Sequence, residues 1–183
     1  MSTNIQKTGI IYGDGESIGE NLLVDSLKDA EQSHTTYSIA DYPFTEALVS
    51  GDTYTISIDI TMSSDKKAFC VYHSGGSYNM GSWQTNATSG VYKYSFTATD
   101  NMASRTGSTY NHGYARVYVS NNNGMQGLTS ITGTANVNWL KIEKGSIPTP
   151  WTPNPNDAIY TGEHGFFEGS DIASIGKGYF SSN

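Results

Sequence analysis

The residues able to bind a metal ion or act as a nucleophile stand apart from one another in this sequence. A transition-metal site needs histidine, cysteine or carboxylate ligands at short spacings, yet the four histidines, His34, His73, His112 and His164, occur singly. The one cysteine, Cys70, has no partner for a disulfide, and its place in a predicted strand indicates a small buried hydrophobic residue. We therefore expect no metal centre, no cofactor and no cysteine nucleophile.

Hydrolytic chemistry finds equally little support. The chain lacks the Gly-x-Ser-x-Gly elbow of the serine hydrolases. The glycine-rich stretch 13–17 matches neither a dinucleotide-binding loop nor an EF-hand, and it indicates a surface turn. Binding of a single calcium ion by the carboxylates of Asp14 and Glu16 stays an alternative. Two carboxylates brought together by the fold could still cleave a glycosidic bond. A glycan-cleaving enzyme therefore remains the least favoured alternative.

Charge and hydropathy exclude other classes of function. The chain of 183 residues carries a formal net charge of −7 and has a pI near 4.9. This charge disfavours binding to nucleic-acid phosphates and to anionic membrane surfaces. No apolar run is long enough to cross a bilayer, and residues 1–9 lack the apolar core of a signal peptide. We expect synthesis in a cytoplasm and no export through a signal peptide. We also expect no nucleic-acid partner and no membrane insertion.

The clearest structural signal follows the turn Ser50-Gly51-Asp52. Four apolar residues, Tyr54, Ile56, Ile58 and Ile60, alternate there with threonine, serine and aspartate. This period of two predicts a strand with one buried and one solvated face. Such a strand needs sheet partners and a second layer to bury its apolar row.

Further short segments supply those partners. Strands are predicted at residues 21–24, 68–73, 91–99, 115–120 and 137–143, with turn signals between them. No long amphipathic helix is indicated. The pattern predicts an all-β protein, an antiparallel β-sandwich with jelly-roll connectivity. Its predicted interior comprises Tyr54, Ile56, Ile58, Tyr92, Tyr94, Phe96, Val117 and Val119.

The last predicted strand is apolar on both faces, with Val137 and Trp139 opposite Leu140 and Ile142. It is either a central strand or one whose outer face the following segment covers. Four of the five prolines fall within residues 148–155, around Trp151, and make that segment stiff and extended. We therefore predict a strap across the sandwich, in which Trp151 packs near Trp139.

Three pieces of sequence resemble a known type of domain. Residues 137–145, Val-Asn-Trp-Leu-Lys-Ile-Glu-Lys-Gly, followed by the Pro-Thr-Pro-Trp-Thr-Pro run at 148–153, resemble the end of jelly-roll, carbohydrate-binding-module-like domains of phage tail-fibre, baseplate and other minor structural proteins. Residues 19–23 resemble the opening strand of these domains, and residues 50–57 resemble their Gly-x-x-Tyr-Thr strand. Residues 171–180 resemble a C-terminal tail of phage fibre and other virion proteins.

The resemblance implies a β-sandwich domain at 19–155 and a C-terminal extension for assembly at 156–183. Residues 1–18 fall outside the pattern, and we expect them to be an N-terminal attachment segment. It implies a virion structural protein made in the cytoplasm of a bacterial host. Other virion proteins, further copies of the chain (a trimer by analogy with fibres) and a host-surface glycan would be its partners, and it would not be an enzyme. The alternative is a free or enzyme-appended carbohydrate-binding module.

Sugar binding requires aromatic faces for the apolar side of the ring and planar polar groups for its hydroxyls. The alternative to a sugar-binding role is an ordinary structural one, since tyrosines are common in β-sandwiches. The candidate sugar contacts are Asp59, Tyr72, Tyr78, Trp83, Tyr110, His112, Arg116 and Tyr118.

The terminal segments contain apolar residues too dispersed to fold alone. Covered by another subunit, they would hold the protein to copies of itself or to the particle. The candidate assembly residues are Ile10, Ile11, Ile159, Tyr160, Phe166, Phe167, Ile172, Ile175, Tyr179 and Phe180.

Overall fold

The computed structural model describes residues 10–11, 17–27, 33–74, 78–106, 109–123, 132–157, 159–161 and 165–167. Strands dominate these residues, and the one helix among them is a single turn. In chain order the elements are β1 (Ile10–Ile11), β2 (Ser17–Ile18), β3 (Ser38–Pro43), β4 (Thr53–Met62), β5 (Ala68–His73), β6 (Gln84–Thr85), β7 (Gly90–Thr97), α1 (Asp100–Ala103), β8 (Tyr114–Ser120), β9 (Ala135–Lys144), β10 (Ile159–Thr161) and β11 (Gly165–Phe167).

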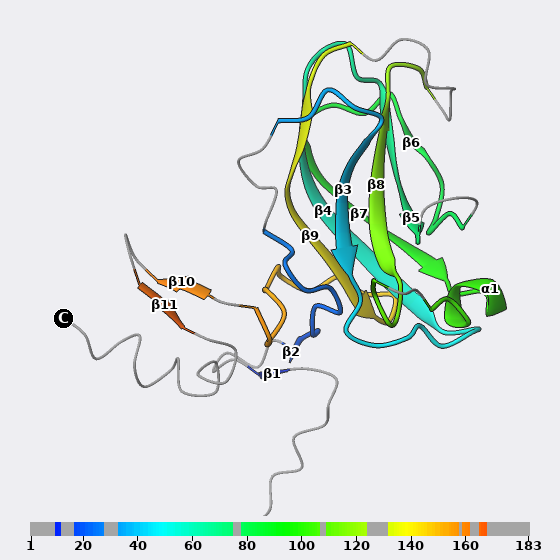
Figure 1. The fold of residues 1–183 in the computed structure, drawn as a ribbon, viewed down its shortest axis with the longest axis vertical. Coiled ribbons are helices and arrows are strands. Elements are labelled where there is room, and N and C mark those ends of the chain that lie inside the picture. The colour runs from blue at the N-terminus through cyan, green and yellow to red at the C-terminus, as the bar shows by residue number, and fades with distance from the viewer. Residues whose placement is uncertain are drawn as a thin grey trace, which may run out of the picture.

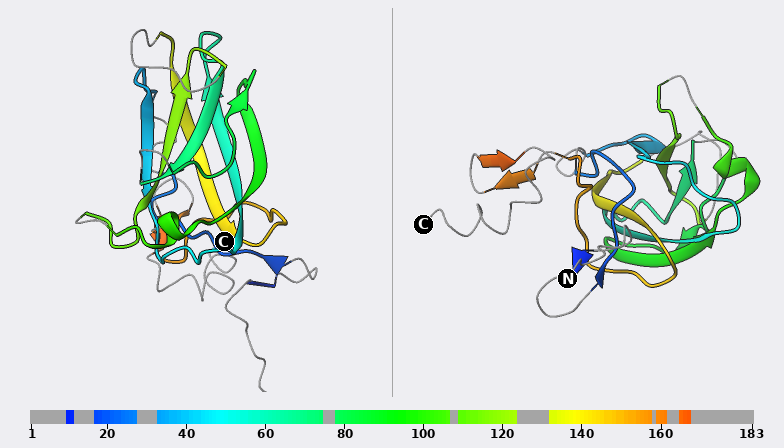
Figure 2. Two further views of the ribbon diagram at one scale, coloured as in Figure 1. Left: turned by 90° about the vertical axis from the view of Figure 1, so that its right-hand side faces the viewer. Right: turned by 90° about the horizontal axis from the view of Figure 1, so that it is seen from below.

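Seven strands form two antiparallel sheets that pack face to face (Figures 1 and 2). The larger sheet has the order β3-β8-β5-β6, and the smaller has the order β7-β4-β9. The chain changes sheet between β3 and β4, between β4 and β5, and at each step from β6 to β9, as the predicted jelly-roll connectivity requires. The prediction of an all-β antiparallel sandwich is confirmed.

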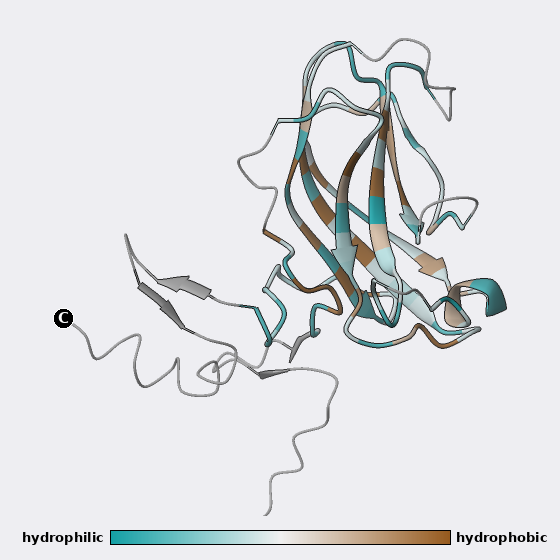
Figure 3. Ribbon diagram, in the orientation of Figure 1, coloured by the Kyte–Doolittle hydropathy of each residue, from teal (hydrophilic) through white to brown (hydrophobic). Residues whose placement is uncertain are grey.

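The core lies between the sheets and follows the predicted alternation. Apolar and polar residues alternate along β4 and β8 (Figure 3), and the apolar ones face inward. Six of the eight predicted interior residues are buried, while Tyr92 and Tyr94 are half-buried and pack against the core. The buried six are Tyr54, Ile56, Ile58, Phe96, Val117 and Val119.

A β-bulge explains why β9 is apolar on both faces. Trp139 pairs with Asp59, but Val137 pairs with Ile60, so Asn138 is an extra residue in the ladder. The extra residue reverses the alternation, and therefore Val137 faces the core together with Leu140 and Ile142. Trp139 points outward and meets Trp151 with ring centroids 6.0 Å apart. The predicted contact between strap and strand is confirmed.

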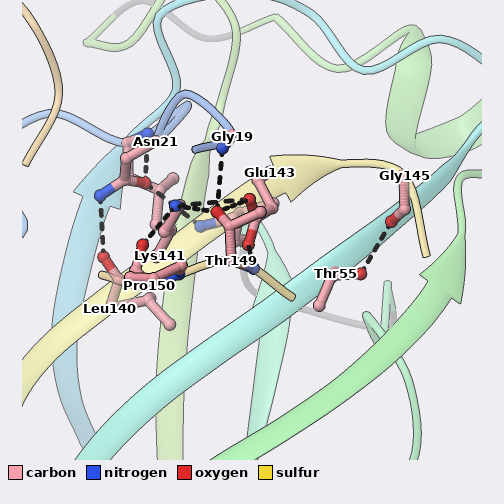
Figure 4. A network of polar contacts seen from close by, with 11 residues as sticks. Gly19, Asn21, Thr55, Leu140, Lys141, Glu143, Gly145, Thr149 and Pro150 are labelled. Carbon is pink, nitrogen blue, oxygen red and sulfur yellow. Dashed lines mark hydrogen bonds and ion pairs between the residues drawn. The ribbon is translucent and has the colours of Figure 1, made fainter. Parts of the chain in front are cut away.

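The strap covers a buried polar network on the outer face of the smaller sheet (Figure 4). Lys141 and Glu143 point out of β9, yet neither side chain is exposed, and Lys141 Nζ lies 3.3 Å from Glu143 Oε2. Thr149 of the strap donates its backbone N–H to Glu143 Oε1 at 2.8 Å and accepts from Lys141 Nζ at 2.7 Å. Gly19 N donates to the same threonine hydroxyl at 2.9 Å. The network joins the start of the sandwich, its last strand and the strap.

The segment at residues 21–24 differs from its prediction. Residues 21–24 form no regular strand, because Leu23 makes a single β-bridge, to Phe44. The Asn21 side chain makes hydrogen bonds to backbone groups of β9 that a paired strand would otherwise make. It donates to Leu140 O at 3.1 Å, and its Oδ1 accepts from Leu23 N and Ile142 N. An asparagine can replace backbone partners in this way because its amide both donates and accepts.

Two hairpins form two-stranded sheets of their own, β1-β2 and β10-β11. The strand β3 lies at the edge of the larger sheet, and an edge strand tolerates Pro43. Of the candidate assembly residues, Ile10, Ile11, Ile159, Tyr160, Phe166 and Phe167 belong to the hairpins. The other four, Ile172, Ile175, Tyr179 and Phe180, lie outside the described residues.

Candidate functional site

The outer face of the β3-β8-β5-β6 sheet gathers most of the candidate sugar contacts. Along β8, alternate residues are buried in the core, while Tyr114, Arg116 and Tyr118 point outward and stay half-exposed. Antiparallel pairing places Tyr72 of β5 and Asp41 of β3 beside Arg116 on the same face. The inner row of β8 contains Val117 and Val119, as predicted.

Four aromatic rings lie together on this face, and we call them the aromatic cluster: Tyr37, Tyr72, Trp83 and Tyr118. The ring of Tyr118 lies 4.8 Å from that of Tyr37 and 5.2 Å from that of Tyr72, centroid to centroid. Trp83 lies 6.4 Å from Tyr37 and 6.5 Å from Tyr72. Such a group offers flat apolar surface to a ligand.

Trp83 reaches the cluster because its loop continues the sheet. Met80 N donates to Val71 O at 2.9 Å, and Gln84 and Thr85 form β6 at the edge of β5. Between them, the indole N–H of Trp83 donates to the Tyr72 hydroxyl at 3.2 Å. Tyr72 itself is only 5 % exposed, so it supports Trp83 and offers little surface of its own.

Next to the aromatic cluster the surface is hollowed over about 380 Å³, within the range of small-ligand sites. Strand residues form one side of this hollow, and the loop between α1 and β8 forms the other. The lining residues are Asp41, Ser74, Arg105, Thr106, Thr109, Tyr110, Gly113, Tyr114 and Arg116. The helical turn matters here because Arg105 comes just after its C-cap residue, Ser104, and Arg105 N donates to Met102 O.

An ion pair shapes the floor of the hollow. Arg116 Nε donates to Asp41 Oδ1 at 2.6 Å, and its Nη2 pairs with Asp41 Oδ2. The bond to Asp41 raises the pKa of Arg116, so this guanidinium stays charged at every ordinary pH. A two-pronged pair of this kind is rigid and presents its remaining donors and acceptors in one plane. Planar polar groups of this type suit the hydroxyls of a sugar.

A second guanidinium stands at the rim. Arg105 lies over the ring of Tyr78, with Cζ 3.9 Å from the ring centroid. Behind it, His73 is fully buried and stacks on Phe44 at 5.0 Å. Burial, and then the charge of Arg105, lower the pKa of His73 to about 4. His73 is therefore a neutral packing residue at neutral pH.

The structure brings six of the eight candidates to this face or its border: Tyr72, Tyr78, Trp83, Tyr110, Arg116 and Tyr118. His112 sits in the turn after Tyr110, half-buried and outside the residues that line the hollow. Asp59 lies on the other sheet, where it accepts from Asn138 Nδ2 at 3.0 Å. Asp59 is therefore separate from this group.

Sequence reading missed four charged or aromatic members of the site: Tyr37, Asp41, Arg105 and Tyr114. The alternation of Ala40, Tyr42 and Phe44 with polar or proline residues was a usable signal for β3, and would have placed Asp41 outward. No local pattern marks Arg105, because its position depends on the fold of a loop.

Other kinds of site find no support among the described residues. They contain no group of three or more histidine, cysteine, aspartate or glutamate residues close enough to hold a metal ion. In the same part of the chain, no helix has the length and hydropathy to cross a membrane. Cys70 is buried in β5, and burial raises the pKa of its thiol to about 12, which keeps it a poor nucleophile.

Comparison with known proteins adds little. No protein-family model matches the chain, and neither does any curated protein. One solved structure that is similar is described as the EclA C-terminal domain, a sugar-binding protein. It shares 14 % identity at a TM-score of 0.36, over 76 % of this chain and 90 % of that one. A likeness this distant carries no argument about what this chain binds.

Proposed function

We propose that this chain binds glycan through the outer face of the β3-β8-β5-β6 sheet, as a surface component of a phage particle. The observation that carries the glycan proposal is the aromatic cluster beside a 380 Å³ hollow whose floor is the Asp41–Arg116 pair. Aromatic faces suit the apolar side of a sugar ring, and the planar ion pair suits its hydroxyls.

Binding without catalysis fits this site better than hydrolysis. Glycoside cleavage uses two carboxyl groups across the scissile bond. Asp41 is the one carboxylate among the described residues that line the hollow, and Arg116 engages both of its oxygens. The proposed role is therefore recognition.

Two features support the virion part of the proposal. The first is the sequence resemblance of residues 137–153 and 171–180 to phage structural proteins. The second is the pair of hairpins, β1-β2 and β10-β11, outside the two main sheets. A two-stranded hairpin is at best marginally stable alone, so these segments need cover from another copy or another virion protein. A symmetric homo-oligomer, with a trimer as the analogue of fibres, would provide it.

The test is a glycan array probed with the full chain, with Tyr110→Ala as the binding variant. Val91→Ala is the matched control, since Val91 is exposed on β7 of the other sheet. We expect discrete glycans to be retained by the wild type and the control, and lost with Tyr110→Ala. The proposal is contradicted if none of the three proteins retains a glycan, or if the wild type, Val91→Ala and Tyr110→Ala retain the same glycans equally.

The virion role and the free-module alternative differ in assembly. Sedimentation of the full chain against a shorter chain ending at Asp157 measures it. We expect the full chain to be oligomeric and the shorter chain to be monomeric. Two equal monomer masses favour a free or enzyme-appended module, while release of sugar from a retained glycan favours an enzyme.

A further inference from the structure

Arg105 differs from the other charged residues of the hollow because it has no ionic partner within the described part of the chain. Arg116 is held by Asp41 through two bonds. Arg105 instead lies on the ring of Tyr78, and none of the described carboxylates forms an ion pair with it. The described residues that line the hollow thus include two guanidinium groups and one carboxylate.

This excess of positive charge in the hollow contrasts with the charge of the rest of the protein. The chain as a whole has a formal net charge of −7, so the hollow opposes the overall charge of the protein. A guanidinium presents a planar fork of N–H donors that matches a carboxylate or a phosphate. Stacking on Tyr78 holds that fork in place, so less side-chain entropy is lost when an anion binds.

We propose that the hollow takes an acidic saccharide, whose anionic group binds Arg105 while its ring lies against Tyr110 and Tyr114. This inference rests on the proposed glycan binding and names its ligand class. The anionic group is a carboxylate, as in a uronic or sialic acid, or a sugar phosphate. The Asp41–Arg116 pair and the hydroxyl of Thr109 then face the uncharged hydroxyls.

The first experiment compares matched glycans. The full chain is applied to immobilised oligosaccharides in which uronate-, sialate- and phosphate-bearing members each have a neutral member of the same backbone. We expect retention of acidic members at least about tenfold above their neutral partners, because a hydrogen bond to a charged group outweighs a neutral one. The acidic members that bind also distinguish a carboxylate from a phosphate.

The second experiment assigns the preference to Arg105. Calorimetry with the best acidic member and its neutral partner is repeated for Arg105→Gln, Arg105→Lys and Lys93→Gln. The last is a matched control for charge, since Lys93 is exposed on β7 of the other sheet. We expect the acidic preference to vanish in Arg105→Gln, to persist in part in Arg105→Lys and to stay whole in Lys93→Gln. Thermal melting of each variant confirms that it is folded.

The outcomes separate this inference from the proposed function. Equal retention of acidic and neutral members overturns the acidic ligand but leaves glycan binding intact. Retention of no member overturns both. An acidic preference that survives unchanged in folded Arg105→Gln overturns the assignment to Arg105.

Discussion

The two sheets of the sandwich use similar side chains on their outer faces for opposite purposes. On the smaller sheet, Lys141 and Glu143 are sealed beneath the strap, where Thr149 bonds to both of them and Gly19 bonds in turn to Thr149. On the larger sheet, Arg116 and Asp41 form an even closer pair, yet each side chain is 29 % exposed beside an open hollow. Coverage, more than residue type, distinguishes a structural ion pair from one available to a ligand.

This difference leads to a separation of effects. Changes beneath the strap should cost stability and spare glycan binding, because the network faces away from the hollow. Changes on the open face should cost binding and spare stability, because half-exposed side chains lose little on truncation. Each of the following predictions tests that separation.

The largest effect is expected for Glu143→Ala. This change leaves Lys141 buried without its partner, which costs about 3–5 kcal/mol of unfolding free energy. The control is Asp52→Ala, which removes the exposed pair between Asp52 and Lys144 on the same strand and should cost less than about 1 kcal/mol. Urea unfolding measures both, and equal costs would show that the strap does not isolate the network from water.

The next effect is a pH dependence from His73. Its pKa is about 4 in the folded protein and 6.5 ordinarily, so between these values the unfolded chain binds more protons than the folded one. Stability is therefore complete above about pH 6.5 and falls toward pH 4, by up to about 3 kcal/mol. In His73→Phe, this part of the unfolding profile should be flat. A variant profile with the wild-type slope would assign the titration to another group.

A smaller loss is expected for Gly19→Ala. A methyl group at this position would lie 1.9 Å from Glu143 Oε2, and that oxygen is fixed by the bonds of the network. The clash should cost about 1–3 kcal/mol without changing affinity for a glycan. A wild-type midpoint in urea would mean that the carboxylate can move aside, and that the network is looser than its distances indicate.

The smallest effect on stability is expected for Trp83→Ala. Trp83 is half-exposed on the open face, so we expect a cost near about 1 kcal/mol in unfolding free energy. Affinity for the bound glycan should fall at least about tenfold, because an aromatic stacking face is lost. Calorimetry beside urea unfolding measures the two together. A large loss of stability with unchanged affinity would place Trp83 among the structural residues.

The sequence predicts the sheets well and the two outer faces unequally. Period-two alternation is a local signal, so the inner and outer rows of β4, β5 and β8 follow directly from it. The buried network escapes such reading because it joins Gly19 and Asn21 to residues more than a hundred positions away. It also buries Lys141, a residue type that is almost always exposed.

The bulge in β9 and the loop before β8 show the same limit. One extra residue at Asn138 reverses the alternation that a regular strand would give. Arg105 reaches the hollow only through the turn of α1. Backbone irregularities of this kind depend on tertiary packing, so side-chain direction after them is not fixed by local sequence.

The central claim is that the open face of the β3-β8-β5-β6 sheet binds the glycan. The most direct measurement is an NMR titration of the full chain with the glycan that the array identifies. The account predicts that amide shifts concentrate at Asp41, Arg105, Tyr110, Arg116 and Tyr118, with none at Lys141 or Thr149. Shifts confined to the strap and β9 would contradict it.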